Sequence, residues 1–363
     1  MNSKTIINDS RKIILTFAIA LSTGWLFLQG GLPAPFLMGS LFGVWVIGAN
    51  VKKLQPHLGV ARWFHIPVVL GLGVLIGSHF TAEIWQHAFA WSDTLLAMVI
   101  VTIIVTLCGY LFLTKIRQYD HLTAFLCSVP GGQAEVLVMA REHVEKDYVV
   151  ALFHLIRVAF VFFSTPLLLA FIQGSEAVNQ SNQQLASMPS LMDLSLVELG
   201  YFLGLGIIGY AIARQVRLPM AHLLGPVILS TIAHAAGLIH IPRIFEFVML
   251  AQLAIGGAVG ARLAQVRFAE LLYYLRDAIA NTTMILCLYF IAAMIMVQIA
   301  GLDLLALWLA FVPGGLYEVT LLALIFGFDI AFVAFHHTVR IILIFISMPF
   351  AARSLQKHRQ KSE

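Results

Sequence analysis

Charged side chains are scarce in this 363-residue chain: 11% of its residues are Asp, Glu, Lys or Arg, whereas 60% are hydrophobic. Soluble domains are typically ~25% charged, so the chain lacks the polar groups needed to cover a surface in water. The shortage predicts an all-α polytopic membrane protein embedded in a lipid bilayer. The net charge of +4 comes from the connections between apolar segments, and no basic run interleaved with aromatics predicts nucleic-acid binding.

Cysteine and the usual catalytic motifs are also nearly absent. Cys108, Cys127 and Cys287 stand alone within apolar segments, at spacings that fit neither a disulfide framework nor a metal site. No HExxH, CxxC, P-loop or GxSxG pattern occurs. We therefore expect neither an enzyme nor a bound metal or cofactor.

Long apolar runs take the place of these missing features. A helix that spans a bilayer needs ~20 mostly apolar residues, and ten segments approach that length. They lie at about 13–29, 33–50, 63–80, 94–114, 148–172, 194–213, 219–238, 245–261, 278–300 and 330–351. No Ala-x-Ala-like cleavage site follows the first segment, so we interpret it as a transmembrane helix rather than a signal peptide.

Two further apolar segments, about 122–140 and 304–327, each contain a helix breaker and a carboxylate. Residues 129–136 read Val-Pro-Gly-Gly-Gln-Ala-Glu-Val, and residues 312–319 read Val-Pro-Gly-Gly-Leu-Tyr-Glu-Val. Proline cannot continue a helix and glycine relaxes it. The motif therefore predicts two half-helices in each segment, with Gly132 and Gly315 capping the second of each pair. A kink in a continuous spanning helix is the alternative.

The two motifs, 183 residues apart, belong to a longer internal repeat. The other matched markers are Leu32-Pro33 with Leu218-Pro219, Gly73 and Gly77 with Gly256 and Gly260, His154-x-x-Arg157 with His337-x-x-Arg340, and Pro166 with Pro349. Five markers in one order predict a duplication. The repeats are 12–172 and 193–353, with a polar linker at 173–192 and a tail at 354–363. The matched glycines predict close helix packing.

The distribution of Lys and Arg favours inverted repeats, because basic residues stay on the cytoplasmic side. If the motif segments are re-entrant, 19 of the 22 basic residues lie inside, one lies outside, and Arg157 and Arg340 lie within the membrane. If the motif segments span, the split is 13 to 7. We therefore predict five spanning helices and one re-entrant segment per repeat, in the bacterial inner membrane, with both termini cytoplasmic and a periplasmic linker.

The candidate binding residues are those of the two breaks and of the His-x-x-Arg helices. Half-helix N-termini attract anions, the glutamates either cap the half-helices or bind a coupling H⁺ or Na⁺, and the arginines pair with the glutamates or bind substrate. The histidines either pack or relay protons. The set is Pro130, Gly131, Gly132, Glu135, His154, Arg157, Pro313, Gly314, Gly315, Glu318, His337 and Arg340.

Val-Pro-Gly-Gly-x-x-Glu, His-x-x-Arg and Leu-Pro-x-x-x-Leu-x-Gly resemble motifs of the AbrB-type bacterial integral membrane family, over about 12–353. This family has a duplicated membrane domain and is unrelated to the small DNA-binding regulator of the same name. Its members carry the labels "ammonia monooxygenase" and "regulator of gene expression". The resemblance implies no established catalytic residues.

The leading hypothesis is a secondary transporter, because inverted repeats with broken helices are typical of that class. The solute is expected to be small and anionic or carboxylate-bearing, with H⁺ or Na⁺ as the coupling cation. A membrane-embedded regulator that acts indirectly or through a partner is the alternative. A monooxygenase is disfavoured because no metal-ligand set is visible, and a homodimer is left open.

Cysteine labelling tests the inverted arrangement. Ser175→Cys is expected to react with a membrane-impermeant thiol reagent from the periplasm, and Ser354→Cys only from the cytoplasm, because the charge bias places these positions on opposite sides. Labelling of Ser175→Cys from the cytoplasmic side would contradict the inverted model.

Overall fold

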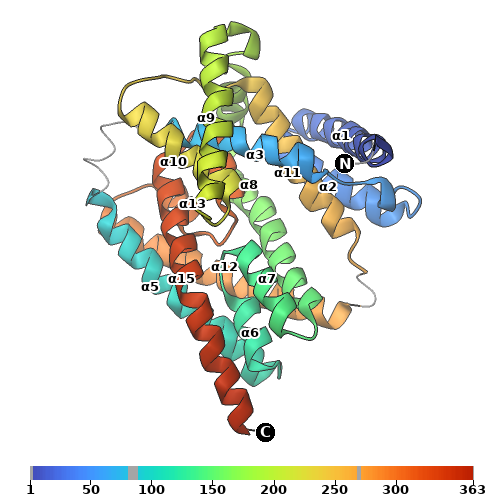
Figure 1. Cartoon of the computed structure of the whole chain (residues 1–363), viewed down its shortest axis with the longest axis vertical. Coiled ribbons are helices and arrows are strands. Elements are labelled where there is room, and N and C mark those ends of the chain that lie inside the picture. The colour runs from blue at the N-terminus through green and yellow to red at the C-terminus, as the bar shows by residue number, and fades with distance from the viewer. Residues whose placement is uncertain (1–2, 81–88, 268–270, 363) are drawn as a thin grey trace. The chain divides into compact units, whose positions relative to one another are not determined.

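The computed structural model describes residues 3–80, 89–267 and 271–362, and these residues form helices and connections without a strand. Seven described helices are long and apolar enough to cross a membrane. They are α1 (Ser3–Gln29), α5 (Ser92–Leu111), α8 (Asp147–Ala186), α9 (Leu196–Gln215), α11 (Phe245–Ala264), α12 (Leu272–Ala300) and α15 (Ile330–Ser362) (Figure 1). The chain is an all-α, multi-pass membrane protein, as predicted.

Three of the ten predicted spans are shorter helices. They are α2 (Pro35–Asn50), α3 (Arg62–Gly77) and α10 (Ala221–Ala235). At 1.5 Å per residue the longest of them measures ~24 Å, less than the ~30 Å of a hydrocarbon core. In the described part of the chain, seven of the ten predicted spans are therefore helices of full spanning length, and the other three are shorter than predicted.

Both Pro-Gly-Gly segments are broken into two half-helices, as predicted. The first consists of α6 (His121–Ser128) and α7 (Gln133–His143), and the second of α13 (Leu304–Phe311) and α14 (Leu316–Phe326). Asp120 caps α6 by accepting from the Thr123 N–H at 2.9 Å, and Asp303 caps α13 by accepting from the Leu305 N–H at 2.8 Å. Each half-helix is at most ~17 Å long, too short to cross a bilayer alone.

Helix bounds follow the predicted repeat. The bounds of α6 and α13, the bounds of α7 and α14, and the first residues of α8 and α15 all differ by 183. Ala34 and Met220, each the residue after a Leu-Pro pair, both adopt the left-handed conformation at the start of α2 and α10. The two copies thus fold alike locally, while their inversion in the membrane stays a prediction.

The polar segment after the first repeat differs from the expected loop. Helix α8 continues to Ala186 and is interrupted only at Gly174, which has φ 80°. The linker predicted at 173–192 is therefore helical at residues 175–186. Likewise, the backbone of the predicted tail continues α15 to Ser362. Polar composition marks the end of an apolar run, but it does not mark the end of a helix.

The chain forms two compact units, and each draws on both predicted repeats. Unit 1 contains Met1–Phe89, Phe162–Val266 and Thr320–Ala331, and unit 2 contains Ala90–Val161, Arg267–Val319 and Phe332–Glu363. Both Pro-Gly-Gly breaks, the half-helices α6, α7 and α13, the first turn of α14 and the His-x-x-Arg segments of α8 and α15 lie in unit 2, whereas α14 from Thr320 onward belongs to unit 1. The glycine-rich helices α3 and α11 lie in unit 1.

Within unit 1, the matched glycines allow helices to touch. A Cβ at Gly77 of α3 would overlap Ser230 and the Val227 carbonyl of α10. A Cβ at Gly260 of α11 would overlap the Leu41 carbonyl of α2. The packing interpretation of these glycines is confirmed. Each contact joins the glycine helix of one repeat to the Leu-Pro helix of the other.

Replacing Gly260 tests this packing. Gly260→Ala is expected to lower the thermal unfolding temperature of the detergent-purified protein by several degrees, because overpacking costs ~1–3 kcal/mol. Gly204→Ala in α9 is the matched control, since a Cβ there meets nothing within 4 Å, and it should leave the temperature unchanged or raised. Equal behaviour of the two variants would contradict the close α2–α11 contact.

Candidate functional site

Each break holds four residues, 129–132 and 312–315, between its half-helices. In the first break, Gly131 has φ 131° and Gly132 has φ 59°. A residue with a side chain would be strained at such positive φ angles. Gly132 is also the cap residue of α7. This confirms the predicted role of Gly132. In the second break, Gly315 directly precedes α14, and its carbonyl accepts from the Val319 N–H at 3.0 Å.

Arg157 satisfies the carbonyl end of the first half-helix. Its two Nη atoms donate to the carbonyls of Val129 and Cys127, both at 2.6 Å. His154, one turn earlier on α8, bonds the Leu126 carbonyl through Nε2 at 3.0 Å. The last carbonyls of a helix have no partner within it and carry its negative dipole end. A cation with several donors is therefore stabilised at this end of α6.

Arg340 does the same for the second half-helix. Its Nη atoms donate to the carbonyls of Phe311 at 2.7 Å and Val312 at 3.0 Å, and His337 bonds the Leu309 carbonyl at 2.8 Å. Arg157 and Arg340 are 2% and 1% exposed, so these bonds form away from solvent. The bonds to Leu126 and Leu309 and those to Val129 and Val312 are equivalent under the offset of 183, whereas Arg340 bonds Phe311, one residue beyond the counterpart of Cys127.

The bonds of His337 fix its protonation. Arg340 Nη2 lies 2.8 Å from His337 Nδ1, and a guanidinium only donates. Nδ1 must therefore accept, so the proton of the neutral ring is on Nε2 and is donated to Leu309. A second proton would break the bond to Arg340. This geometry favours a positioning role for His337 over proton relay.

The acceptors of the two arginines differ from the glutamates expected as their partners. Among the described residues, neither guanidinium forms an ion pair with a carboxylate; backbone carbonyls are the acceptors. Glu318 is buried, 4% exposed, and its carboxylate turns back over Gly315, where a Cβ would overlap it. It thus lies at the first turn of α14, the position favourable for an acid. The side chain of Glu135 lies outside the described residues.

The two breaks of unit 2 contact the arginine helices of opposite repeats. A Cβ at Gly131 would lie 3.2 Å from Ile344 and 3.8 Å from Arg340 Nε, both on α15. A Cβ at Gly314 would lie 3.3 Å from Val161 on α8. Gly131 with Ile344 and Gly314 with Val161 are the same contact under the offset of 183. The two Pro-Gly-Gly breaks are therefore linked through both arginine helices.

Both arginines reach the first break: Arg157 donates to the Val129 carbonyl, and a Cβ at Gly131 would lie 3.8 Å from Arg340 Nε. Tyr289, on α12, is fully buried and hydrogen-bonded to Thr102 Oγ1 at 2.9 Å. The Nε–H of each arginine is buried and has no hydrogen-bond partner in the described ranges. The centre of unit 2 thus holds two positive charges whose hydrogen bonds go to neutral groups.

Helix α12 contributes polar residues that the sequence analysis missed. Asp277, Asn281 and Tyr289 follow one face at intervals of four and eight residues, and all three are buried. Asn281 lies against Gly109 and Ser128, and both of its amide atoms lack partners in the part of the chain described. The spacing of these polar residues within an apolar segment could have predicted a polar face on this helix.

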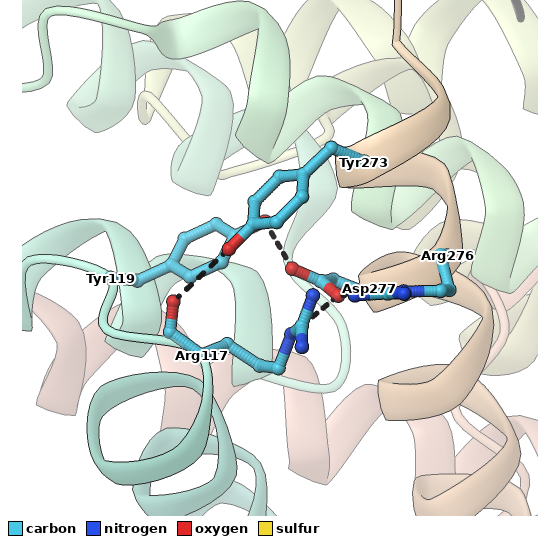
Figure 2. A network of polar contacts seen from close by, with 5 residues as sticks. All are labelled: Arg117, Tyr119, Tyr273, Arg276 and Asp277. Carbon is cyan, nitrogen blue, oxygen red and sulfur yellow. Dashed lines mark hydrogen bonds and ion pairs between the residues drawn. The ribbon is translucent and has the colours of Figure 1, made fainter.

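Asp277 joins α12 to the connection after α5 (Figure 2). Arg117 Nε pairs with its carboxylate at 2.6 Å, the Tyr119 hydroxyl donates to it at 3.0 Å, and the Arg117 guanidinium lies over the Tyr273 ring at 5.1 Å. Burial, followed by the charge of Asp277, raises the pKa of Tyr119, so its hydroxyl stays protonated and donating. Basic and aromatic residues together are typical of a cytoplasmic membrane interface.

Comparison with known proteins identifies the family. A family model described as "Transition state regulatory protein AbrB" matches residues 37–356. The chain belongs to the AbrB family. It is 22% identical to "Uncharacterized protein YhjN" of Bacillus subtilis, over 95% of this chain and 94% of that protein. It is 23% identical to "Putative regulator AbrB" of Escherichia coli, over 96% of this chain and 97% of that protein. The resemblance seen in the motifs is confirmed.

Within the described ranges of this AbrB-family chain, His, Cys, Asp and Glu side chains do not gather in groups of three or more that could hold a metal ion. Cys127 is buried, and only its carbonyl takes part in the site.

Removing Arg117 tests the Asp277 anchor. Arg117→Gln is expected to lower the thermal unfolding temperature clearly, because breaking a buried pair strands the Asp277 carboxylate at a cost of ~3–5 kcal/mol. Arg276→Gln is the control: Arg276 is 68% exposed and 4.0 Å from the same carboxylate, so little change is expected. An Arg117→Gln protein as stable as the control would rule out the anchor.

Proposed function

We propose that this protein is a secondary transporter of a small anionic or carboxylate-bearing solute, coupled to H⁺ or Na⁺. We place it in the bacterial inner membrane with both termini in the cytoplasm. The observation that carries the proposal is the pair of buried, neighbouring guanidiniums of Arg157 and Arg340. Their hydrogen bonds go to carbonyls and a neutral histidine.

Two buried like charges make this site attractive to an anion. Carbonyl bonds satisfy the donors of the guanidiniums without cancelling their charge, and a charge is screened less where the dielectric constant is low. A carboxylate that reaches the two unpartnered Nε–H groups gains two charge-assisted hydrogen bonds. Such a ligand would offset the positive charge of the two guanidiniums.

The broken helices supply a means of coupling and of movement. Glu318 is buried at the start of α14, and Glu135 occupies the equivalent position of α7. Ionisable residues within membrane segments are costly and usually functional. We propose that binding of H⁺ or Na⁺ near these glutamates balances the charge of the solute. Rocking or sliding of one helix bundle around a fixed site would then alternate access, as in many repeat transporters.

A regulatory role is the second candidate, because the family description and the name of the Escherichia coli relative both refer to regulation. In that case the same anion site would act as a sensor, and its occupancy would be passed to a partner. The two roles differ in whether transport itself is required.

Uptake into proteoliposomes tests the transporter. Arg157→Lys and Arg340→Lys are each expected to reduce gradient-driven uptake of the transported anion at least ~tenfold. Lysine cannot reproduce the planar fork that holds two carbonyls and presents Nε, and one lost charge-assisted bond is worth ~1.5–3 kcal/mol. Labelled acetate, benzoate, succinate and glutamate are the probes, with imposed H⁺ and Na⁺ gradients.

Arg243→Lys is the matched control, because Arg243 bonds His79 in unit 1, away from the broken helices in sequence and contacts. It should transport normally. The proposal fails if folded lysine variants keep wild-type uptake, or if Glu135→Gln combined with Glu318→Gln leaves gradient-driven uptake intact. A transport-dead variant that restores the transcription pattern of a deletion strain would favour the regulator.

A further inference from the structure

Unit 2 contains a cavity of about 550 Å³ between α5, α6 and α15. This volume lies within the roughly 300–1,000 Å³ of small-molecule sites. Along α15 its lining begins at Arg340 and continues at Leu343, Ile344, Ser347, Met348 and Ala351, a spacing that follows one helix face. At 1.5 Å per residue this face is ~16 Å long. The cavity is therefore elongated, and Arg340 is the first residue of its α15 wall.

The wall is apolar apart from this one charge. Among the residues that line the cavity, Arg340 alone is charged. The nearby hydroxyls are already engaged: Thr102 with Tyr289 at 2.9 Å, and Thr106 with the Thr102 carbonyl at 2.7 Å. The cavity thus offers an apolar wall and one cation, with few free groups for a polar solute.

Arg340 is suited to hold the charged end of a ligand. It is 1% exposed, its Nη atoms are bound to carbonyls, and its Nε–H lacks a partner in the described ranges. The charge of Arg157 adds to the positive potential nearby. A single anionic group at this place would be stabilised, whereas a second charge further along the wall would lie unpaired in an apolar surrounding.

We infer that the cavity binds an amphiphilic monocarboxylate: its carboxylate lies at Arg340 and its alkyl or aryl body lies between α5 and α15. This inference rests on the proposed function, because it names the substrate class of the same anion site. It separates amphiphilic monocarboxylates from dicarboxylates and amino acids, whose second charged group would have to enter the apolar part of the cavity.

The test is a chain-length series measured on the full-length protein in phosphatidylcholine nanodiscs. Dissociation constants are determined by calorimetry for acetate, butyrate, hexanoate and octanoate, with succinate and octanol for comparison. Affinity is expected to rise about fourfold for each methylene buried. Octanoate should bind at least tenfold more tightly than either succinate or octanol, because succinate buries a charge and octanol lacks one.

Matched variants locate the effect. Thr106→Phe places a ring in the cavity from α5, and it should flatten the series beyond butyrate while leaving acetate binding unchanged. Ile104→Phe adds the same bulk on α5 at a residue that is 49% exposed and outside the cavity lining, so it should keep the full slope. Arg340→Lys should weaken all carboxylates and leave octanol unaffected. Unfolding temperatures show that each variant is folded.

The outcomes separate this inference from the proposed function. Arginine-dependent uptake of a small anion without any chain-length slope would overturn the inference and leave the transporter standing. A slope without transport would support the binding site and reject the transporter. Equal binding of octanol and octanoate, or loss of octanoate binding when phosphatidylglycerol is added to the nanodiscs, would assign the cavity to lipid and overturn the inference.

Discussion

A broken backbone in apolar surroundings is the constraint on which unit 2 depends. Each interruption leaves carbonyls and amides without helical partners, and a membrane interior supplies little water to satisfy them. Arginine meets this need well, because its planar fork reaches two carbonyls at once. The same side chain therefore closes the end of a half-helix and brings a positive charge to it. Structural support and ligand attraction are two properties of one residue at each break.

The two breaks stabilise their interrupted backbone in similar but unequal ways. The first relies on left-handed glycine backbone, at Gly131 and Gly132. In the second break, the Glu318 carboxylate folds over Gly315, and a side chain at that position would overlap it. Arg340 also differs from Arg157 in its bond to a histidine ring and in lining a cavity. The two near-symmetric halves of the site therefore differ, because Arg340 lines the apolar cavity and Arg157 is not among its lining residues.

Features that depend on local backbone chemistry were predictable from the sequence: the half-helices, the Gly132 cap, the order of helices and the close contact at Gly77 and Gly260. The partners of Arg157 and Arg340 were not, because a carbonyl acceptor belongs to every residue type and leaves no mark in the sequence. The sequence suggested carboxylate partners, whereas the acceptors seen among the described residues are backbone carbonyls. The place of Tyr289 in the site was not predicted, because it depends on the arginines of α8 and α15, which are distant from Tyr289 along the chain. The helix after Gly174 was missed because polar composition suits an exposed helix as well as a loop.

The interleaving of the two predicted repeats has a consequence for the origin of such a chain. Neither unit is made from one repeat: α3 needs α10, α11 needs α2, and each break rests on the arginine helix of the other copy. A half-length ancestor would have exposed its glycine grooves and an open helix break. It could have folded only as an intertwined pair of identical subunits, so fusion of the two genes would have joined partners that already depended on each other.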